Sequence, residues 1–496
     1  MYRIKLYQHG VVVKKYIKLV AVPIMAAYVS VTQAAELELQ PCFTDGVKSK
    51  ALCGILNVAE DPAKALSDNN QVPLNVVVLP KFKEESKELP VMFLAGGPGQ
   101  AATELAGALN TPMWELRQKH DIILIDQRGT GKSNGLRCPV NDIDGLLFDD
   151  SNVDMKEEVN KCLETFSDRY LPSYNTYQAI EDFEAVREAL GHKQVHIYGG
   201  SYGTRAGFAY LKNHPESIKT AILDSNAPMS LVVGLFGKTS ETAFDYLIED
   251  CQAHEKCNEA FPNLKQDFVT LMAQLDKANI EESIYHPVSG DKVTMILSKS
   301  KVTEAMRGTL YNLASRQILP FVVNKAANGD YRSLATLIAS SSASSGNPGG
   351  LYTGLTMNIL CNEDFSRVTQ QALKNDADNY FNGELGYSAF TDVCEFWPKW
   401  QAPENFAEPV KTDVPVLLFS GKYDPVTPPE YAEMALPGLS NAKHVVIENG
   451  SHVPSLAMCM GAVQSFIETG SFKDVDFSCA EADIARMFLT DLNQLH

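Results

Sequence analysis

Seven short apolar runs occur along the chain, at residues 73–79, 90–96, 121–126, 195–200, 220–225, 414–421 and 444–449. They are rich in Val, Ile and Leu and show no alternation with polar residues. Such runs are typical of strands whose two faces are both covered by helices. We therefore predict that they are buried strands of a parallel sheet.

Helical patterns lie between these runs. Residues 175–191 place Ile180, Phe183 and Val186 on one stripe and end at Gly191, a residue suited to a helix C-terminus. A second helix is predicted over 204–215, where Pro215 would stop it. The repeated order of strand, helix and strand predicts an α/β fold with a mostly parallel central sheet flanked by helices.

The alternation stops after Asn226. Residues 227–410 contain mostly helical patterns and loops, and strand patterns resume at Val414. We predict a core formed by residues 36–226 and 411–496, interrupted by a helical cap over residues 227–410. The Ser- and Gly-rich stretch 340–350 is predicted to be a mobile loop.

The N-terminus has the composition of a secretory signal peptide. Residues 1–18 carry Arg3 and four lysines but no acidic residue, and an uncharged apolar run follows over 19–31. That run is short for a membrane span. We predict a signal peptide over residues 1–35, cleaved after Ala34 or Ala35, and export to the periplasm or the medium. A retained N-terminal anchor or a core strand are the alternatives.

The charge and the cysteines narrow the possible functions. A formal net charge of -18 argues against nucleic-acid binding, which needs a basic surface. The 10 cysteines suit an exported, disulfide-bonded chain. The sequence does not fix their connectivity, but we expect local pairs in chain order, listed as Cys42–Cys53, Cys138–Cys162, Cys251–Cys257, Cys361–Cys394 and Cys459–Cys479. No cysteine pair has zinc-site spacing, so no metal site is expected.

A candidate nucleophile stands in the stretch Gly-Gly-Ser-Tyr-Gly at 199–203. A Gly-x-Ser-x-Gly turn between a strand and a helix exposes the serine hydroxyl at the carboxyl edge of the sheet. Glycines permit the tight backbone, and the helix N-terminus favours a developing negative charge. We predict that Ser201 is a catalytic nucleophile. The alternative is a glycine-rich turn that binds phosphate or only packs.

A serine nucleophile needs a base and an acid, and two residues near the last predicted strands fit these roles. Asp424 follows the run 414–421, and His452 follows the run 444–449. The chain order Ser, Asp, His is that expected of α/β-hydrolases. We predict Asp424 and His452 as the other members of a triad. A turn acid before Pro425 and a surface histidine are the alternatives.

Two backbone N–H groups are predicted to stabilise an oxyanion. One belongs to Tyr202, and the other to Gly97 in the glycine-rich loop 93–102. A plain tight turn is the alternative for that loop. The stretch 126–133 ends in Gly-Lys-Ser, but Asp126 stands where a phosphate-binding loop needs glycine, so nucleotide binding is excluded. Asp126 and Arg128 are expected to brace the loops around the site.

These motifs together resemble a known family. They include GGPG at 96–99, DQRGTGKS at 126–133, YGGSYGTRAG at 198–207, CNEDF at 361–365 and GSHVP at 450–454. The chain resembles α/β-hydrolase peptidases of the proline iminopeptidase and tripeptidyl aminopeptidase family, especially the exported branch, from about Cys53 to Val453. Ala95 departs from the family's frequent His-Gly-Gly-Pro-Gly, which leaves the backbone donors unaffected.

The resemblance implies an α/β-hydrolase fold and release of N-terminal proline, other residues or short peptides up to tripeptides. It implies that Glu363 binds the substrate's free ammonium group, against the alternative of a structural acid. Peptides are the expected partners, with no cofactor, no nucleic acid and, after signal cleavage, no membrane. An esterase or lipase with the same triad is the main alternative, and a binding protein without catalysis is the second. Peptide length, oligomeric state and periplasm versus medium stay open.

Overall fold

Nine strands form one sheet in the order β1-β2-β3-β5-β4-β6-β7-β10-β11. The computed structural model describes residues 37–139, 153–286, 289–345 and 350–492, and these residues form one compact unit. The strands are β1 (Gln40–Cys42), β2 (Ala51–Val58), β3 (Val72–Leu79), β4 (Val91–Leu94), β5 (Ile122–Ile125), β6 (Val195–Gly200), β7 (Ile218–Asp224), β10 (Val416–Gly421) and β11 (Ala442–Ile447).

All seven predicted runs are strands, but the direction predicted for one is wrong. Strand β3 pairs antiparallel with both β2 and β5, and β1 pairs antiparallel with β2. The other neighbours, from β5 to β11, are parallel. Strand β3 is buried along nearly its whole length. An apolar run covered on both faces carries no mark of strand direction, which explains the error.

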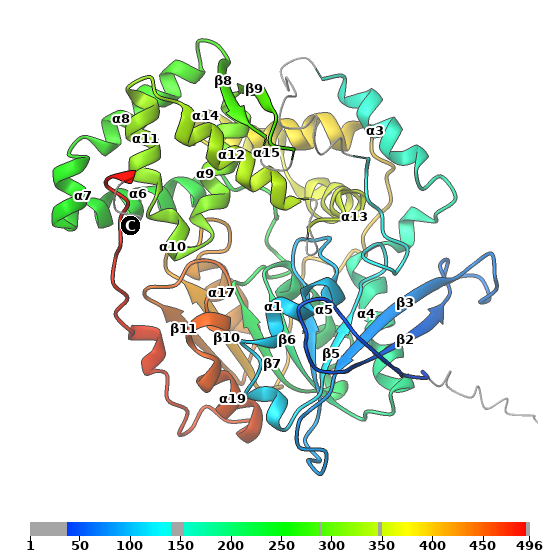
Figure 1. The fold of residues 1–496 in the computed structure, drawn as a ribbon. Coiled ribbons are helices and arrows are strands. Elements are labelled where there is room, and N and C mark those ends of the chain that lie inside the picture. The colour runs from blue at the N-terminus through cyan, green and yellow to red at the C-terminus, as the bar shows by residue number, and fades with distance from the viewer. Residues whose placement is uncertain (1–36, 140–152, 287–288, 346–349, 493–496) are drawn as a thin grey trace, which may run out of the picture. The chain divides into compact units, whose positions relative to one another are not determined.

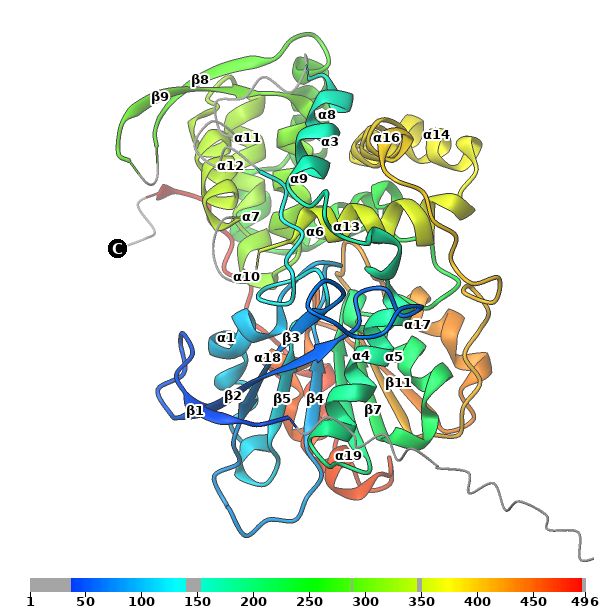
Figure 2. The ribbon, with the colours of Figure 1, turned by 90° about the vertical axis from the view of Figure 1, so that its right-hand side faces the viewer.

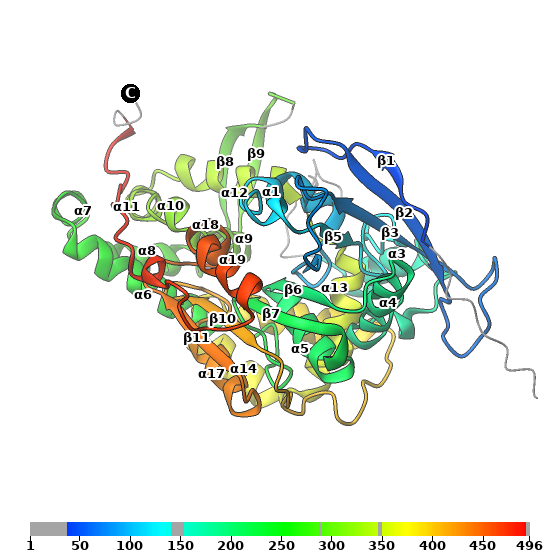
Figure 3. The same ribbon diagram turned by 90° about the horizontal axis from the view of Figure 1, so that it is seen from below.

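Helices cover both faces of the sheet, so successive side chains of a strand enter different cores. In β4, Met92 and Leu94 pack with α4 (Thr176–Ala189) and α5 (Tyr202–Asn213), whereas Val91 and Phe93 pack with α1 (Ala106–Asn110) and α19 (Met460–Thr469). Figure 3 shows these two helix pairs on opposite sides of the strands. The helices of the core are α1 (Ala106–Asn110), α4 (Thr176–Ala189), α5 (Tyr202–Asn213), α17 (Pro429–Ala435), α18 (Ser455–Met458) and α19 (Met460–Thr469).

Helix α4 has the ends that the sequence predicts. The Asn175 side chain accepts a hydrogen bond from the N–H of Gln178 and so caps the first turn. The chain leaves the helix at Gly191, whose φ of 76° lies in the left-handed region that glycine adopts without strain. These ends fix where α4 starts, and its first residue, Thr176, recurs in the site described below.

Between β7 and β10, residues 243–339 have a hydrophobic core of their own, whereas buried residues further along the chain, such as Leu355 and Ile359, pack into a core of the central sheet. Figures 1 and 2 show that the whole region between these two strands is largely helical. Its helices are α6 (Gly237–Ala253), α7 (Glu255–Ala260), α8 (Leu264–Leu275), α9 (Lys299–Leu310), α10 (Leu313–Arg316), α11 (Leu319–Ala327), α12 (Arg332–Ser345), α13 (Thr353–Ile359), α14 (Gln370–Asn379), α15 (Gly383–Ser388) and α16 (Cys394–Phe396). Helix α3 (Met155–Glu164) contacts the end of this region.

Two features of this region differ from the sequence prediction. Strands β8 (Ile280–Tyr285) and β9 (Lys292–Leu297) form an antiparallel hairpin that was not predicted. Alternate side chains of β8 are exposed, so the hairpin lacks the continuous apolar runs of the central sheet. Residues 340–345, predicted as loop, form the end of α12, and residues 346–349 lie outside the described residues.

The five predicted disulfides are all present and leave no free cysteine. They join partners separated by 6 to 33 residues, so every closed loop is local. The predicted signal peptide lies outside the described residues. Within the part of the chain that the structure describes, no helix has both the length and the apolar character needed to cross a membrane.

Candidate active site

Ser201 occupies a sharp turn between β6 and α5. Its φ of 57° and ψ of -125° place a non-glycine residue in a strained part of backbone space. The Ser201 N–H donates to the carbonyl oxygen of Asp224, the last residue of the neighbouring strand β7, at 2.9 Å. The turn therefore has the backbone geometry of a nucleophile elbow, which presents the serine at the carboxyl end of the sheet.

Two glycines allow this turn to form. A Cβ atom at Gly203 would lie 2.0 Å from the carbonyl oxygen of Leu94, and one at Gly199 would lie 2.3 Å from that of Gly203. Real Cβ atoms do not approach backbone so closely, so any side chain there would push α5 away from β4 and β6. The glycines thus let the nucleophile helix pack directly on the strand that leads into the Gly97 loop.

Asp424 and His452 meet at the ends of β10 and β11. His452 Nδ1 lies 2.9 Å from Asp424 Oδ2 and 3.0 Å from Oδ1. Asp424 Oδ1 also accepts hydrogen bonds from the N–H groups of Val426 and Thr427. A histidine whose Nδ1–H donates to a carboxylate carries its free lone pair on Nε2, the form that a general base needs.

The carboxylate of Asp424 is held in its ionised form. Burial disfavours ionisation, but the charge and hydrogen bond of His452 and the N–H groups of Thr427 and Val426 outweigh burial and lower the pKa of Asp424. The Tyr311 ring packs edge-on against the imidazole, with ring centroids 4.7 Å apart. The His452 N–H donates to the carbonyl of Tyr311, so the end of α9 fixes the histidine loop.

Ser201 and His452 approach each other through their neighbours. A Cβ at Gly200 would lie 3.3 Å from Val453, so the residue before the serine packs against the residue after the histidine. Thr427 and Tyr311, which both contact His452, line one pocket together with Ser201. Among the described residues, the hydrogen bonds of His452 involve its Nδ1 atom and its backbone N–H. We expect a hydrogen bond between Nε2 and Ser201 in the substrate complex, because catalytic hydrogen bonds often tighten only when substrate binds.

Gly97 and Tyr202 lie beside Ser201 in this pocket. Tyr202 is the first residue of α5, and the first N–H groups of a helix have no acceptor within it. Gly97 has a φ of 111°, which only glycine adopts readily. The two predicted oxyanion donors are therefore brought to the nucleophile.

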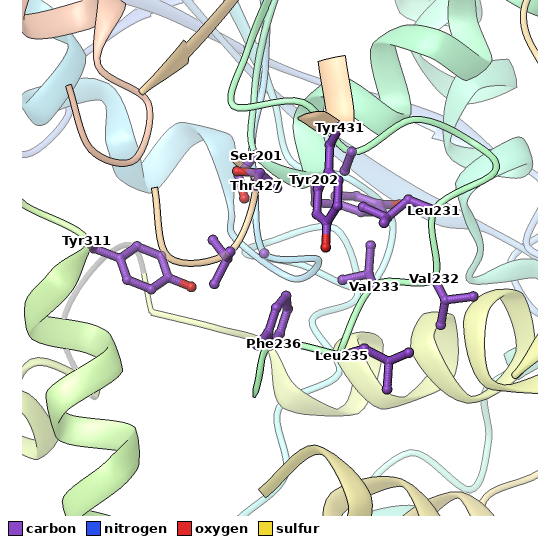
Figure 4. Close-up of a pocket in the computed structure, with 13 residues that line it drawn as sticks. Ser201, Tyr202, Leu231, Val232, Val233, Leu235, Phe236, Tyr311, Thr427 and Tyr431 are labelled. Carbon is purple, nitrogen blue, oxygen red and sulfur yellow. The ribbon is translucent and has the colours of Figure 1, made fainter. Parts of the chain in front are cut away.

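The pocket is small and apolar, with a volume of about 40 Å³. No charged side chain lines it, and its walls come from the Gly97 loop, the start of α5, the loop before α6, Tyr311 at the end of α9 and the region after Asp424. Figure 4 shows Ser201 at its edge. The lining residues are Gly97, Ser201, Tyr202, Ala227, Leu231, Val232, Val233, Leu235, Phe236, Tyr311, Val426, Thr427 and Tyr431.

Glu363 lies outside this lining, in the π-helical turn η6 (Leu360–Asp364). It is only 1% exposed, and its two oxygens accept hydrogen bonds from the N–H and the hydroxyl of Thr176. The Thr176 hydroxyl contacts the Tyr202 hydroxyl at 2.7 Å, so Glu363 reaches the pocket wall through one intermediate residue. Burial is the main reason that the pKa of Glu363 is raised to about 7.

Asp126 and Arg128 brace the surrounding loops, as their positions in the sequence indicated. Asp126 accepts hydrogen bonds from the backbone and hydroxyl of Thr103, while Arg128 donates two short hydrogen bonds to the buried carboxylate of Asp182. Among the described residues, no cluster of His, Cys, Asp and Glu side chains is suited to a metal ion.

Sequence reasoning missed Thr427, Tyr311 and Ser225. Thr427 donates to Asp424 Oδ2 at 2.9 Å, and Ser225 donates to the same oxygen at 2.7 Å. An Asp followed by Thr three residues later is a signal for such a turn. Tyr311 carries no such signal, because it enters from a helix more than a hundred residues away from His452.

Comparison with known proteins agrees with this geometry. The alpha/beta hydrolase fold family matches residues 90–456. The putative hydrolase YuaR of Escherichia coli K12 is 25% identical over 430 residues, covering 80% of this chain and 82% of the relative. Serine protease Hip1 of Mycobacterium tuberculosis H37Rv is 26% identical over 243 residues, or 45% of this chain and 46% of the relative.

A relative with broad coverage is a tripeptidyl aminopeptidase of Streptomyces coelicolor. It is 22% identical over 484 residues, covering 90% of this chain and 86% of the relative. The family match spans most of the sheet and the whole stretch from the Gly97 loop to His452. The chain therefore belongs to the α/β-hydrolase fold family and is a serine hydrolase.

Proposed function

We propose that Ser201, His452 and Asp424 form the catalytic triad of an exported serine aminopeptidase. The observation that carries this proposal is the hydrogen bond between His452 Nδ1 and Asp424, formed beside a pocket that holds a strained serine. A strained serine alone fits many turns. A serine with an oriented imidazole at the neighbouring strand ends fits nucleophilic catalysis.

The mechanism follows from these positions. Ser201 Oγ attacks the carbonyl carbon of the scissile bond while His452 Nε2 accepts the hydroxyl proton. The N–H groups of Gly97 and Tyr202 donate to the oxygen that becomes negative. His452 then gives its proton to the leaving amine, and water, deprotonated by the same imidazole, releases the acyl group from Ser201. Asp424 holds the imidazole in orientation and stabilises its positive form.

The proposed substrates are peptides with a free N-terminus, from which proline, another residue or a short peptide up to a tripeptide is released. The names of two relatives, serine protease and tripeptidyl aminopeptidase, support hydrolysis of peptides. Glu363 is the proposed anchor for the substrate's ammonium group. It forms no ion pair among the described residues, so an ammonium ion would supply the missing positive charge.

Contact between substrate and Glu363 requires access past Tyr202 and Thr176, since the carboxylate is buried behind them. This arrangement gives the proposal a sharp test. If Glu363 binds the ammonium, Glu363→Gln raises KM for free-amine substrates only. If it acts through Thr176, the variant changes kcat for free and N-blocked substrates alike.

Export is part of the proposal. The basic N-terminus followed by an uncharged run supports a cleaved signal peptide. The five disulfides support an oxidising compartment, because such bonds do not persist in most cytosols. N-terminal sequencing of the protein recovered outside the cytoplasm tests this point, with Glu36 or Ala35 expected as the first residue.

Ester hydrolysis is a second candidate, favoured by the apolar pocket without a charged lining residue. Esters and amides pass through the same tetrahedral intermediate, so the triad does not distinguish them. The deciding experiment compares aminoacyl and tripeptidyl p-nitroanilides, free or N-acetylated, with p-nitrophenyl esters. The aminopeptidase proposal expects strong preference for the free amine, and equal cleavage of blocked substrates contradicts it.

A variant and a covalent probe test the nucleophile. Ser201→Ala should abolish cleavage, and a fluorophosphonate should label the wild-type protein but not this variant. Peptide products identified by mass spectrometry would give the number of residues released. Undiminished hydrolysis by folded Ser201→Ala would contradict the proposal.

A further inference from the structure

Two adjacent residues at the end of β7, Asp224 and Ser225, contact all three proposed triad positions or the loops that carry them. Neither takes part in the mechanism above. Both are fully buried. The backbone oxygen of Asp224 accepts the N–H of Ser201, and its side chain accepts the N–H of Ser455, just after His452. The side chain of Ser225 contacts both Asp424 and the residue after His452.

Ser225 joins the acid to the histidine loop. Its hydroxyl donates to Asp424 Oδ2 at 2.7 Å and accepts the N–H of Val453, the residue after His452, at 2.7 Å. One hydroxyl thus uses its donor on one triad element and an acceptor lone pair on another. Its position fixes the separation of Asp424 and His452 independently of their own hydrogen bond.

The backbone of Ser225 is held in an unfavourable conformation. Its φ is 65°, in the left-handed region where glycine is the unstrained choice. Glycine would satisfy the backbone but would lack the hydroxyl. The chain therefore tolerates strain at a position where a hydroxyl bridges two proposed catalytic loops, and such strain gathers at functional sites.

Asp224 holds the histidine loop at a second point. Its Oδ2 accepts the N–H of Ser455 at 2.8 Å and the hydroxyl of Tyr198 at 2.9 Å. Its other oxygen, Oδ1, is buried and has no hydrogen-bond partner among the described residues. Because the same residue accepts the Ser201 N–H, Asp224 connects the nucleophile turn to the chain just beyond His452.

We propose that Asp224 and Ser225 are positioning residues that hold Ser201, Asp424 and the His452 loop in mutual register for the reaction. The proposal rests on the triad proposed above. It expects their side chains to govern the rate of the chemical step rather than substrate affinity, since small displacements of reacting groups cost rate steeply. It also assigns a role to the Asp-Ser pair that ends β7.

The test removes the Ser225 hydroxyl in two ways. Ser225→Ala and Ser225→Gly both lack it, but glycine relieves the backbone strain, so at least the second variant should fold. For both we expect kcat to fall roughly 10- to 100-fold with KM changed less than about twofold. Ser217→Ala is the matched control, because buried Ser217 also donates to a carboxylate, that of Glu184, far from the triad; its kcat should stay unchanged.

Variants of Asp224 separate its hydrogen bonds from its mere bulk. Asp224→Asn keeps an oxygen for Ser455 and Tyr198, and its kcat should exceed that of Asp224→Ala at least about tenfold. Unchanged kcat in Ser225→Ala and Ser225→Gly, with Ser201→Ala inactive, would overturn the positioning role while leaving the triad intact. Full activity in Ser201→Ala would overturn both proposals.

Discussion

Glu363 accepts hydrogen bonds from both the backbone N–H and the hydroxyl of Thr176, at 2.7 and 2.6 Å. The two residues belong to the turn η6 and to the first turn of α4, and they are 187 residues apart. The carboxylate thus sits at a helix N-terminus, where N–H groups favour a negative charge. Burial opposes that charge more strongly and raises the pKa of Glu363 to about 7.

The raised pKa of Glu363 predicts a dependence of stability on pH. The folded state holds this proton up to about pH 7, whereas the unfolded chain releases it near 4.5, so stability falls as pH rises between these values. Above pH 7 the ionised group lowers the free energy of unfolding by up to about 3 kcal/mol. Glu363→Gln should remove this loss. Its free energy of unfolding, measured in urea, should therefore rise relative to that of wild type between pH 5 and pH 8.

The surface variant Glu404→Gln is the control for this measurement, because Glu404 is exposed. Its unfolding free energy should run parallel to that of wild type across the same range. Parallel curves for Glu363→Gln and wild type would mean that the carboxylate does not carry the proton that we assign to it.

Close packing at the nucleophile helix predicts opposite effects for two glycine substitutions. Gly203→Ala would place a Cβ 2.0 Å from the Leu94 carbonyl oxygen. We expect this variant to lose about 3 kcal/mol or more of its free energy of unfolding and to lose activity as well. Gly308 lies inside α9, where a Cβ would meet nothing within 4 Å. Gly308→Ala should therefore stabilise the protein by about 0.5–1 kcal/mol, measured by denaturant unfolding.

A buried ion pair connects the nucleophile helix to the cap. Arg205 of α5 lies 2.7 Å from Asp364, and the same carboxylate accepts the N–H of Val233 in the pocket wall. Asp364→Asn leaves Arg205 and Arg367 without an anion and should cost about 3–5 kcal/mol. Arg205→Met should cost less, because Arg367 still pairs with Asp364.

The exposed pair Arg332–Asp330 serves as the comparison. Arg332→Met should change the free energy of unfolding by less than about 1 kcal/mol, since exposed ion pairs contribute little. Equal losses of unfolding free energy in Arg332→Met and Asp364→Asn would contradict the prediction that the buried pair stabilises the protein more than the exposed pair.

The contact between His452 and Asp424 predicts that loss of the Asp424 charge lowers kcat and leaves KM almost unchanged. Asp424→Asn keeps the size of the side chain but favours the wrong imidazole tautomer, so we expect kcat to fall roughly 10³- to 10⁴-fold with KM little changed. Steady-state kinetics with a free-amine p-nitroanilide measures both constants. A variant with wild-type kcat would exclude Asp424 as the residue that orients His452.

Most of the core could be predicted from the sequence because its signals are local. Apolar runs located seven of the nine strands of the central sheet but not β1 and β2, and Gly191 marked the end of α4. The elbow around Ser201 could also be predicted, because its glycines are required by contacts with residues close in sequence and with one neighbouring strand. The five disulfides followed because each loop is short.

Other features depend on residues distant in sequence. The direction of β3, the hairpin β8–β9 and the contact of Tyr311 with His452 have no local signature. Resemblance singled out Glu363, but its burial against Thr176 follows from how η6 packs on α4.

By itself, then, the sequence determined seven strands of the central sheet, the elbow and the order Ser201, Asp424, His452, because short-range sterics and periodicity encode them. Only the tertiary structure decided which groups meet. Ser225 bridging Asp424 and the His452 loop depends on three strand ends arriving together, and no single stretch of chain encodes the packing that brings them there.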